Sequence, residues 1–191
     1  MWSPPIVATA ATSEPVDTES AVAHVNAQGV GDDDLIGTIV SAARAHVESY
    51  TGTRMITQTL TLRTDDWYDL ASLPVAPVQS VTSITYVDTD GATQTLATSV
   101  YEARLYGLDP TIVLKFNQVW PTIRLGSLIT VTAVVGYGAA AAVPPELLQS
   151  IKLLVADMYR FRETAQVGQA VAAYPVAATV EALLANHRKF L

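Results

Sequence analysis

The sequence predicts an α+β fold in which N- and C-terminal helices form a small bundle around an inserted antiparallel β-rich region. Residues 32–51 and 145–163 carry apolar residues at helical spacing, whereas residues 54–136 change to the two-residue alternation of strands. Turn residues recur every few positions in that middle part, which favours an antiparallel sheet or sandwich over repeated βαβ units. From its length we expect one compact unit with an elaborated middle.

The N-terminal part is expected to hold two helices. Residues 1–15 are predicted to be a flexible arm, because Pro4 and Pro5 interrupt them. A helix over residues 17–28 follows, with Asp17 as its N-cap. A second helix over residues 32–51 begins at three aspartates, whose charge suits a helix N-terminus, and ends before a glycine. Its apolar face is expected to consist of Leu35, Ile39, Ala43, Val47 and Tyr50.

The middle of the chain carries the pattern of strands. Ile56, Gln58, Leu60 and Leu62 alternate with threonines, so one face of a first strand is expected to be mainly apolar. A strand over residues 78–87 precedes the hairpin signal Asp-Thr-Asp-Gly and leads into residues 93–96. Shorter strands are predicted over residues 100–105, 112–116 and 128–135.

Helical spacing returns at Pro145, a residue suited to the first turn of a helix. The apolar stripe of this helix is expected at Leu148, Ile151, Val155 and Met158. Residues 164–174 form an uncharged linker of mostly small residues, and a last helix is predicted over residues 175–187.

This last helix and the tail form a candidate docking segment, with an apolar face for a groove and cations for an acidic rim. Its residues are Val180, Leu183, Leu184, His187, Arg188, Lys189, Phe190 and Leu191. The ordinary preference of cations for a helix C-terminus explains the same basic tail equally well.

A second candidate site is a loop with three carboxylates and two aromatic rings, formed by Asp65, Asp66, Trp67, Tyr68 and Asp69. Carboxylates suit a metal ion, and aromatic residues are enriched at protein interfaces. A solvated loop with one ring turned inward accounts for these residues equally well.

Motifs of enzymes are missing or lack their context. Residues 136–141 match the G-x-G-x-x-A of a dinucleotide-binding turn, but two prolines restart the helix and no acidic residue ends a following strand. The three histidines are far apart, and residues 32–34 lack the glutamate that closes a calcium loop. There is no cysteine. We therefore expect no enzymatic activity, no cofactor and no metal.

The net charge of −7 is unevenly distributed along the chain. Residues 1–50 hold seven acidic residues and one basic residue, whereas residues 141–191 hold four and five. This asymmetry favours oriented contacts between copies or with a partner, and the acidic excess disfavours tight binding to phosphates. Residues 125–145 are uncharged and long enough to span a bilayer, but their threonines, glycines and prolines indicate a strand, a turn and a helix start. We expect no membrane association.

Four segments occur together in a characteristic order. They are the acidic cap and helix GDDDLIGTIVSAARAHVESYTG followed by RMITQT, the stretch LPVAPVQSVTSITYVDTDG, Trp120-Pro121 with VTAVVGYG and VPPELL, and the closing VEALL. In this order and spacing the chain resembles the phage head-to-tail connector (adaptor) family, which includes the adaptors of gene transfer agents. The resemblance extends from about residue 14 onward.

The resemblance implies a structural protein of the virion neck, made in the cytoplasm of the host bacterium. It implies a homo-oligomeric ring, usually of twelve copies, that binds the portal protein and the tail-completion or stopper protein. Double-stranded DNA would pass through the ring without sequence-specific binding. Residues 16–163 would form the connector domain, and residues 164–191 the linker with its docking helix and tail. The β insertion is larger than in shorter members, and its role is open.

A function of another class fits the same residues. The chain could be a monomeric module whose β region and carboxylate loop hold a sugar, a peptide or an ion. This alternative requires no further copies of the chain. The oligomeric state therefore distinguishes a monomeric binding module from a ring subunit.

Overall fold

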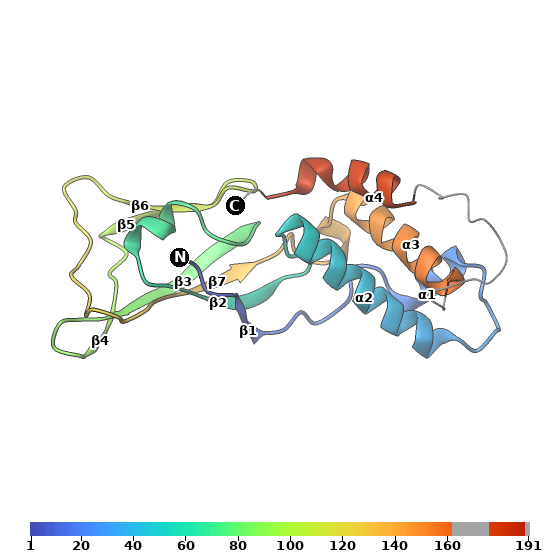
Figure 1. The fold of residues 1–191 in the computed structure, drawn as a ribbon, viewed down its shortest axis with the longest axis horizontal. Helices are drawn as coiled ribbons and strands as arrows, with labels where there is room; N and C mark the ends of the chain where they lie inside the picture. Colours follow the sequence, from blue (N-terminus) through green and yellow to red (C-terminus); the bar gives the residue numbers. More distant parts are fainter. Residues whose placement is uncertain (162–175, 190–191) are drawn as a thin grey trace. The chain divides into compact units, whose positions relative to one another are not determined.

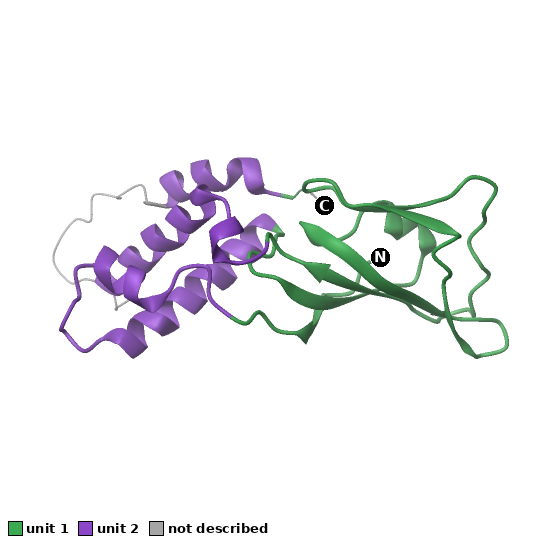
Figure 2. Ribbon diagram, turned by 180° about the vertical axis from the view of Figure 1, so that it is seen from behind, with its two compact units in different colours: residues 1–12, 52–137, 189–191 green, residues 13–51, 138–188 purple. Residues whose placement is uncertain are grey.

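The protein is described here by a computed structural model that places residues 1–161 and 176–189. These residues form four α-helices and seven strands, with antiparallel pairing in both sheets, which confirms the α+β class (Figure 1). The chain divides into two compact units (Figure 2). The β unit contains residues 1–12, 52–137 and 189, and the helical unit contains residues 13–51, 138–161 and 176–188. We expected one compact unit, but the chain forms two, because the β insertion has a hydrophobic core of its own.

The helical unit brings together helices from both ends of the sequence. Its helices are α1 (Thr18–His24), α2 (Asp33–Thr51), α3 (Pro145–Arg160) and α4 (Val176–Leu184), with the 3₁₀ turns η2 (Ala140–Ala142) and η3 (Ala185–His187). Helix α3 packs against α1, α2 and α4, and α1 also packs against α2. This is the small bundle that the sequence predicts.

The buried faces of the two long helices agree in part with the expected ones, since Ala43, Val47, Ile151 and Val155 are buried as predicted. The buried residues of α2 are Ile36, Val40, Ala43, Val47, Glu48 and Thr51, and those of α3 are Leu147, Ser150, Ile151 and Val155. Leu35 is exposed, and Ile39, Tyr50, Leu148 and Met158 are only partly buried. Both helices carry apolar residues at adjacent positions, such as Leu35 and Ile36, and the helical period alone does not decide which of them faces the core.

The ends of these helices follow the sequence. Asp17 has an extended backbone, and its carboxylate accepts a hydrogen bond of 2.6 Å from the backbone nitrogen of Ser20. The cap therefore satisfies one of the amide groups that a helix leaves free at its start. Gly52 follows α2 with a φ of +69°, the left-handed conformation expected of a residue that ends a helix.

Replacing Asp17 by alanine is expected to lower the free energy of unfolding by about 1 kcal/mol, because the Ser20 amide loses its acceptor. The matched control is Glu19→Gln, which removes a charge from the first turn but no cap and should cost only about 0.3 kcal/mol. Urea unfolding followed by circular dichroism measures both values. Equal losses in the two variants would contradict the capping role.

The β unit is built on a five-stranded sheet. Its strands are β1 (Ile6–Thr9), β2 (Gln58–Thr64), β3 (Val78–Val87), β4 (Thr93–Thr95) and β7 (Ile129–Val135), in the order β1-β2-β7-β3-β4. Strands β5 (Tyr101–Arg104) and β6 (Thr111–Leu114) form a separate hairpin. Strand β2 pairs with β7 from Gln58 opposite Val135 to Thr64 opposite Ile129, without a register shift. The β2 alternation, the β3–β4 hairpin and the three short strands agree with the sequence analysis.

Strand β1 corrects the expectation of a flexible N-terminal arm. Ile6 lies opposite Thr61 at the edge of the sheet, and residues 1–12 belong to the β unit. Ile6 and Val7 are β-branched residues that favour a strand, and the preceding prolines are compatible with the beginning of an edge strand. The sequence alone does not indicate that β2 has an unpaired edge with which residues 6–9 can form hydrogen bonds.

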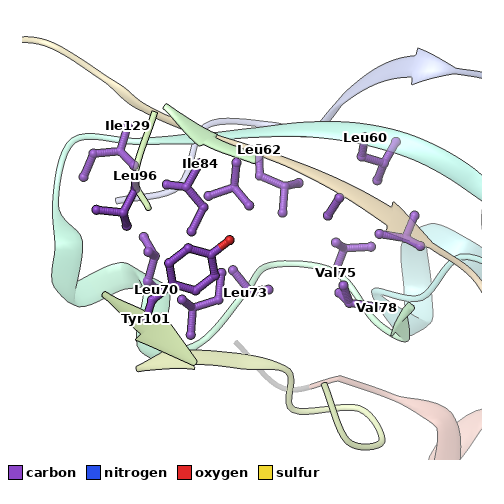
Figure 3. Packing of buried hydrophobic residues seen from close by; sticks show 14 of the residues in the cluster. Leu60, Leu62, Leu70, Leu73, Val75, Val78, Ile84, Leu96, Tyr101 and Ile129 are labelled. Carbon is purple, nitrogen blue, oxygen red and sulfur yellow. The ribbon is translucent and has the colours of Figure 1, made fainter. Parts of the chain in front are cut away.

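The core of the β unit lies between the inner face of the large sheet and a second layer of chain that covers it (Figure 3). The cover consists of the 3₁₀ helix η1 (Trp67–Ala71), the segment after it, and the β5–β6 hairpin. The buried cluster contains Leu60, Leu62, Trp67, Leu70, Leu73, Val75, Val78, Ile84, Leu96, Tyr101, Ile112, Ile129, Val131, Ala133 and Val135. In β2 and β7 every second residue is buried, and the residues between them on the outer face are mostly threonines, so both strands keep the two-residue alternation along their whole length.

The uncharged stretch 125–145 contains β7, the turn η2 and the first residue of α3. Of the helices in residues 1–161 and 176–189, none combines the length and the apolar character that crossing a bilayer requires.

Candidate functional site

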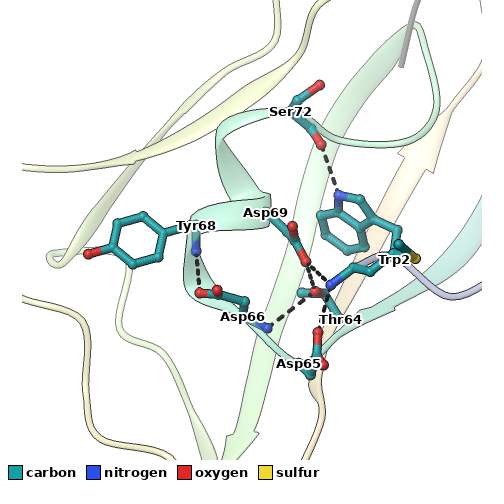
Figure 4. Close-up of polar contacts among 8 residues, drawn as sticks. Trp2, Thr64, Asp65, Asp66, Tyr68, Asp69 and Ser72 are labelled. Atoms are coloured by element: carbon teal, nitrogen blue, oxygen red, sulfur yellow. Dashed lines mark hydrogen bonds and ion pairs between the residues drawn. The ribbon is translucent and has the colours of Figure 1, made fainter.

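The carboxylates of the loop after β2 are engaged by groups of the same chain (Figure 4). Asp66 caps η1, since its side chain accepts a hydrogen bond of 2.9 Å from the backbone nitrogen of Tyr68. The amino group of Met1 lies 2.7 Å from a carboxylate oxygen of Asp65 and 2.7 Å from one of Asp69. Asp69 also accepts a hydrogen bond from the hydroxyl of Thr64.

These ion pairs shift the titration of their members. Hydrogen bonds to Asp65 and then Asp69 raise the pKa of the Met1 amino group to about 10. The same amino group holds the pKa of both carboxyls below their usual range, with a further contribution from Thr64 at Asp69. Within the placed residues, no three histidine, cysteine, aspartate or glutamate side chains come together as a metal would require.

One of the two aromatic residues of this loop is buried and the other is exposed. Trp67 is 8% exposed and stacks in parallel on Trp120, with 4.9 Å between the ring centroids. Its ring also meets Tyr86 edge-on at 5.6 Å, and its indole nitrogen donates to the carbonyl oxygen of Pro121 at 2.9 Å. Tyr68 is 83% exposed. The candidate partner loop is therefore a capped turn with one ring in the core and one ring in solvent.

The apolar face of the candidate docking helix packs within the helical unit. Val180 and Leu184 are buried, and α4 packs against α3. Leu183 is partly buried. An apolar stripe on a predicted helix indicates that this face packs against something. It does not indicate whether the surface that it packs against belongs to the same chain or to a partner.

The basic tail is also held by its own chain. The imidazole of His187 lies 3.7 Å from the Glu146 carboxylate, and the Arg188 guanidinium lies 5.0 Å from the centre of the Tyr50 ring. Lys189 has a fully buried side chain, whose amino group donates to the carbonyl oxygen of Leu108 at 3.2 Å. Phe190 and Leu191 lie outside the described residues.

Two surface features were not found from the sequence. The first is an apolar groove of about 190 Å³ in the helical unit, lined by His46, Tyr50, Leu154, Ala177, Val180, Glu181 and Leu184. It is built by three helices that are far apart in the chain, so no local pattern encodes it. The second is the connection between β6 and β7, where Phe116, Val119 and Leu125 are exposed. The signal for it was a loop rich in apolar residues with no acidic residue.

The two units differ in charge. The described residues of the helical unit include ten acidic and four basic residues, a balance of −6, whereas those of the β unit include seven and six, a balance of −1. Almost all of the acidic excess of the chain is therefore carried by the helical unit.

Comparison with known proteins identifies the fold. No family model and no curated protein matches the sequence. The chain is similar to a chain in the neck of an empty gene transfer agent (GTA) particle, determined with C6 symmetry, and to one in the virion of the native GTA particle. In both cases the TM-score is 0.79 at 22% identity, covering 99% of this chain and 97% of the other.

A third similar structure is the neck of the native GTA particle with C12 symmetry, at a TM-score of 0.68 and 22% identity, covering 96% of each chain. The likeness therefore includes both the helical unit and the β unit. This chain has the fold of a GTA neck chain over almost its whole length.

Proposed function

We propose that this chain is a structural subunit of the neck of a tailed phage or gene transfer agent, where it forms a head-to-tail connector ring. The observation that carries the proposal is the fold likeness to chains of GTA neck structures, which covers 99% of this chain and 97% of the other. A shared core motif would cover only part of each chain. Because the match covers 99% of this chain, it includes the β insertion as well as the helices.

The ring is proposed to contain twelve copies around a channel for double-stranded DNA. The C12 symmetry of one similar neck structure supports this number. The balance of −6 on the helical unit supports a wall that repels phosphates, because tight binding to DNA needs cations that replace its counterions. DNA would then slide past the subunits without being held.

The partners proposed for the two ends of the ring are the portal protein and the tail-completion or stopper protein. Because Val180, Leu184 and Lys189 are buried in their own chain, we assign the portal contact to other residues of the C-terminal segment. The exposed Arg188 and the terminal Phe190 and Leu191 are the groups that we assign to this contact.

The monomeric sugar-, peptide- or ion-binding module is not favoured by the structure. The carboxylates that suggested an ion site are engaged by Met1, Thr64 and the start of η1. The apolar groove described above belongs to the helical unit rather than to the β unit. We therefore retain the ring subunit as the proposed function.

Assembly tests this function directly. Size-exclusion chromatography with light scattering, on the chain alone and mixed with portal protein from the same particle, is expected to show a complex with many copies of the chain. A strict monomer that does not bind portal would contradict the proposal.

Removal of Phe190 and Leu191 tests the docking of the tail. We expect the truncated chain to bind portal at least about tenfold more weakly, as is typical when an aromatic anchor of an interface is lost. Its unfolding should be unchanged, because the contacts of His187, Arg188 and Lys189 remain. Tyr106→Ser, at a tyrosine that is 85% exposed in the β unit, is the control. Undiminished binding by the truncated chain would remove the docking role from the tail.

A further inference from the structure

Residues 115–128 form the connection between β6 and β7 (yellow to light orange in Figure 1) and include three large apolar residues that are at least 79% exposed. Phe116 is 93% exposed, Val119 79% and Leu125 100%. Single exposed apolar residues are common, but three within one connection of a soluble chain mark a surface for binding. We name residues 115–128 the apolar loop.

The backbone of the apolar loop is held in place. At its start the backbone nitrogen of Lys115 donates to the carbonyl oxygen of Val100 at 3.0 Å. In its middle Trp120 stacks on Trp67, and further on the nitrogen of Arg124 donates to the oxygen of Val87 at 2.9 Å. The three exposed side chains therefore project from a fixed backbone, which reduces the entropy lost on docking.

The charge of the apolar loop is opposite to that of the chain. Lys115 precedes Phe116, Arg124 precedes Leu125, and residues 115–128 contain no acidic residue. The loop thus carries +2 in a chain of −7. A surface that accepts it should be apolar, concave and acidic at its edge.

The helical unit has such a surface. Its groove of about 190 Å³ is lined mainly by apolar groups, including Leu154, Val180 and Leu184, and its one acidic lining residue is Glu181. The unit that contains the groove has a balance of −6. The apolar loop and the groove are therefore complementary in polarity and in charge, as a projecting and a receiving surface.

We propose that the apolar loop of one copy docks into the groove of an adjacent copy in the ring. This inference rests on the proposed function. A ring of identical subunits is built from head-to-tail contacts, each of which joins two different patches of the same chain. The loop and the groove are two such patches, and Phe116 is the side chain that we assign to the groove.

The chain contains no cysteine, so cross-linking with introduced cysteines tests the contact without a background. Gln118→Cys places a thiol beside Phe116 and Val119, and His46→Cys places one at the groove. With a short bismaleimide, a mixture of the two single variants is expected to give a cross-linked dimer that neither variant gives alone. A chain with both substitutions should give a ladder of higher oligomers.

Matched controls separate the contact from random collision. Tyr68→Cys, at another exposed aromatic residue of the β unit, should not cross-link with His46→Cys. Adding Phe116→Asp to Gln118→Cys should lower the yield at least about tenfold, as for the loss of an interface anchor. Lys115→Glu should lower the yield as well, and Glu181→Lys in the partner chain should restore it.

The cross-linking results distinguish the loop–groove contact from the alternatives. Rings that form without the Gln118–His46 cross-link, or with a yield no higher than that of the Tyr68 control, would overturn the inference and leave the proposed function in place. Cross-linking of Gln118→Cys to portal or tail protein instead of to His46→Cys would assign the loop to that partner and also overturn it. Failure to assemble with or without portal would overturn both proposals.

Discussion

Replacing Gly136 by alanine is expected to lower the free energy of unfolding of the β unit by about 3 to 5 kcal/mol. Gly136 follows β7 with a φ of +112°, where residues with a side chain are strained. A β-carbon there would lie 2.5 Å from the carbonyl oxygen of Ile56 and 2.7 Å from its carbonyl carbon. Both neighbours are backbone atoms, so no side chain can rotate away to make room.

Gly126→Ala is the matched control, because Gly126 has a φ of +76° but no atom within 4 Å of an added β-carbon. It keeps the backbone strain without the clash and should cost about 1 kcal/mol. Urea unfolding followed by tryptophan fluorescence reports on the β unit alone, since Trp2, Trp67 and Trp120 all lie in it. Losses of similar size in the two variants would show that the close approach to Ile56 is not rigid.

Trp67→Ala is expected to lower the free energy of unfolding of the β unit by about 3 to 5 kcal/mol. The variant leaves a cavity beside Trp120 and Tyr86, and it leaves the carbonyl oxygen of Pro121 without its donor. The apolar loop should then lose its order, because the stack on Trp67 holds its middle.

The comparison for this variant is Trp67→Phe, which keeps a ring but not the indole donor and should cost about 1 to 2 kcal/mol. The control is Tyr68→Ala, which removes a solvent-exposed ring and should change stability by no more than about 0.5 kcal/mol. Urea unfolding gives the three values, and the fluorescence of the remaining Trp2 and Trp120 reports on the order of the β unit, including the apolar loop. A Trp67→Ala variant as stable as Tyr68→Ala would contradict the inward position of Trp67.

Local chemistry made much of the fold predictable. Strand β3 and the turn at Asp88 were expected because β-branched alternation ends in a hairpin signal, and the cap of α1 was expected because Asp17 is a strong N-cap. The buried face of α2 is predicted correctly at Ala43 and Val47, but near the start of the helix Ile36 is buried instead of Leu35. The helical period cannot choose between two adjacent apolar residues until the position of α3 is known. Strand β1 was missed because an edge strand depends on a partner far away in the sequence.

The candidate sites were less predictable than the fold. Asp65 and Asp69 formed a plausible ion site in the sequence, but their partner is the amino group at Met1. Lys189 was expected to be a surface cation and is buried against Leu108. Charge and aromatic content can be read locally, whereas the partner of a side chain is fixed only by the fold.

The most direct test of the central claim is electron microscopy of this chain assembled with portal protein from the same particle. The account predicts a closed ring of twelve copies, coaxial with the portal and surrounding an open channel. A portal particle that carries no additional ring, or copies of this chain bound without rotational symmetry, would contradict it.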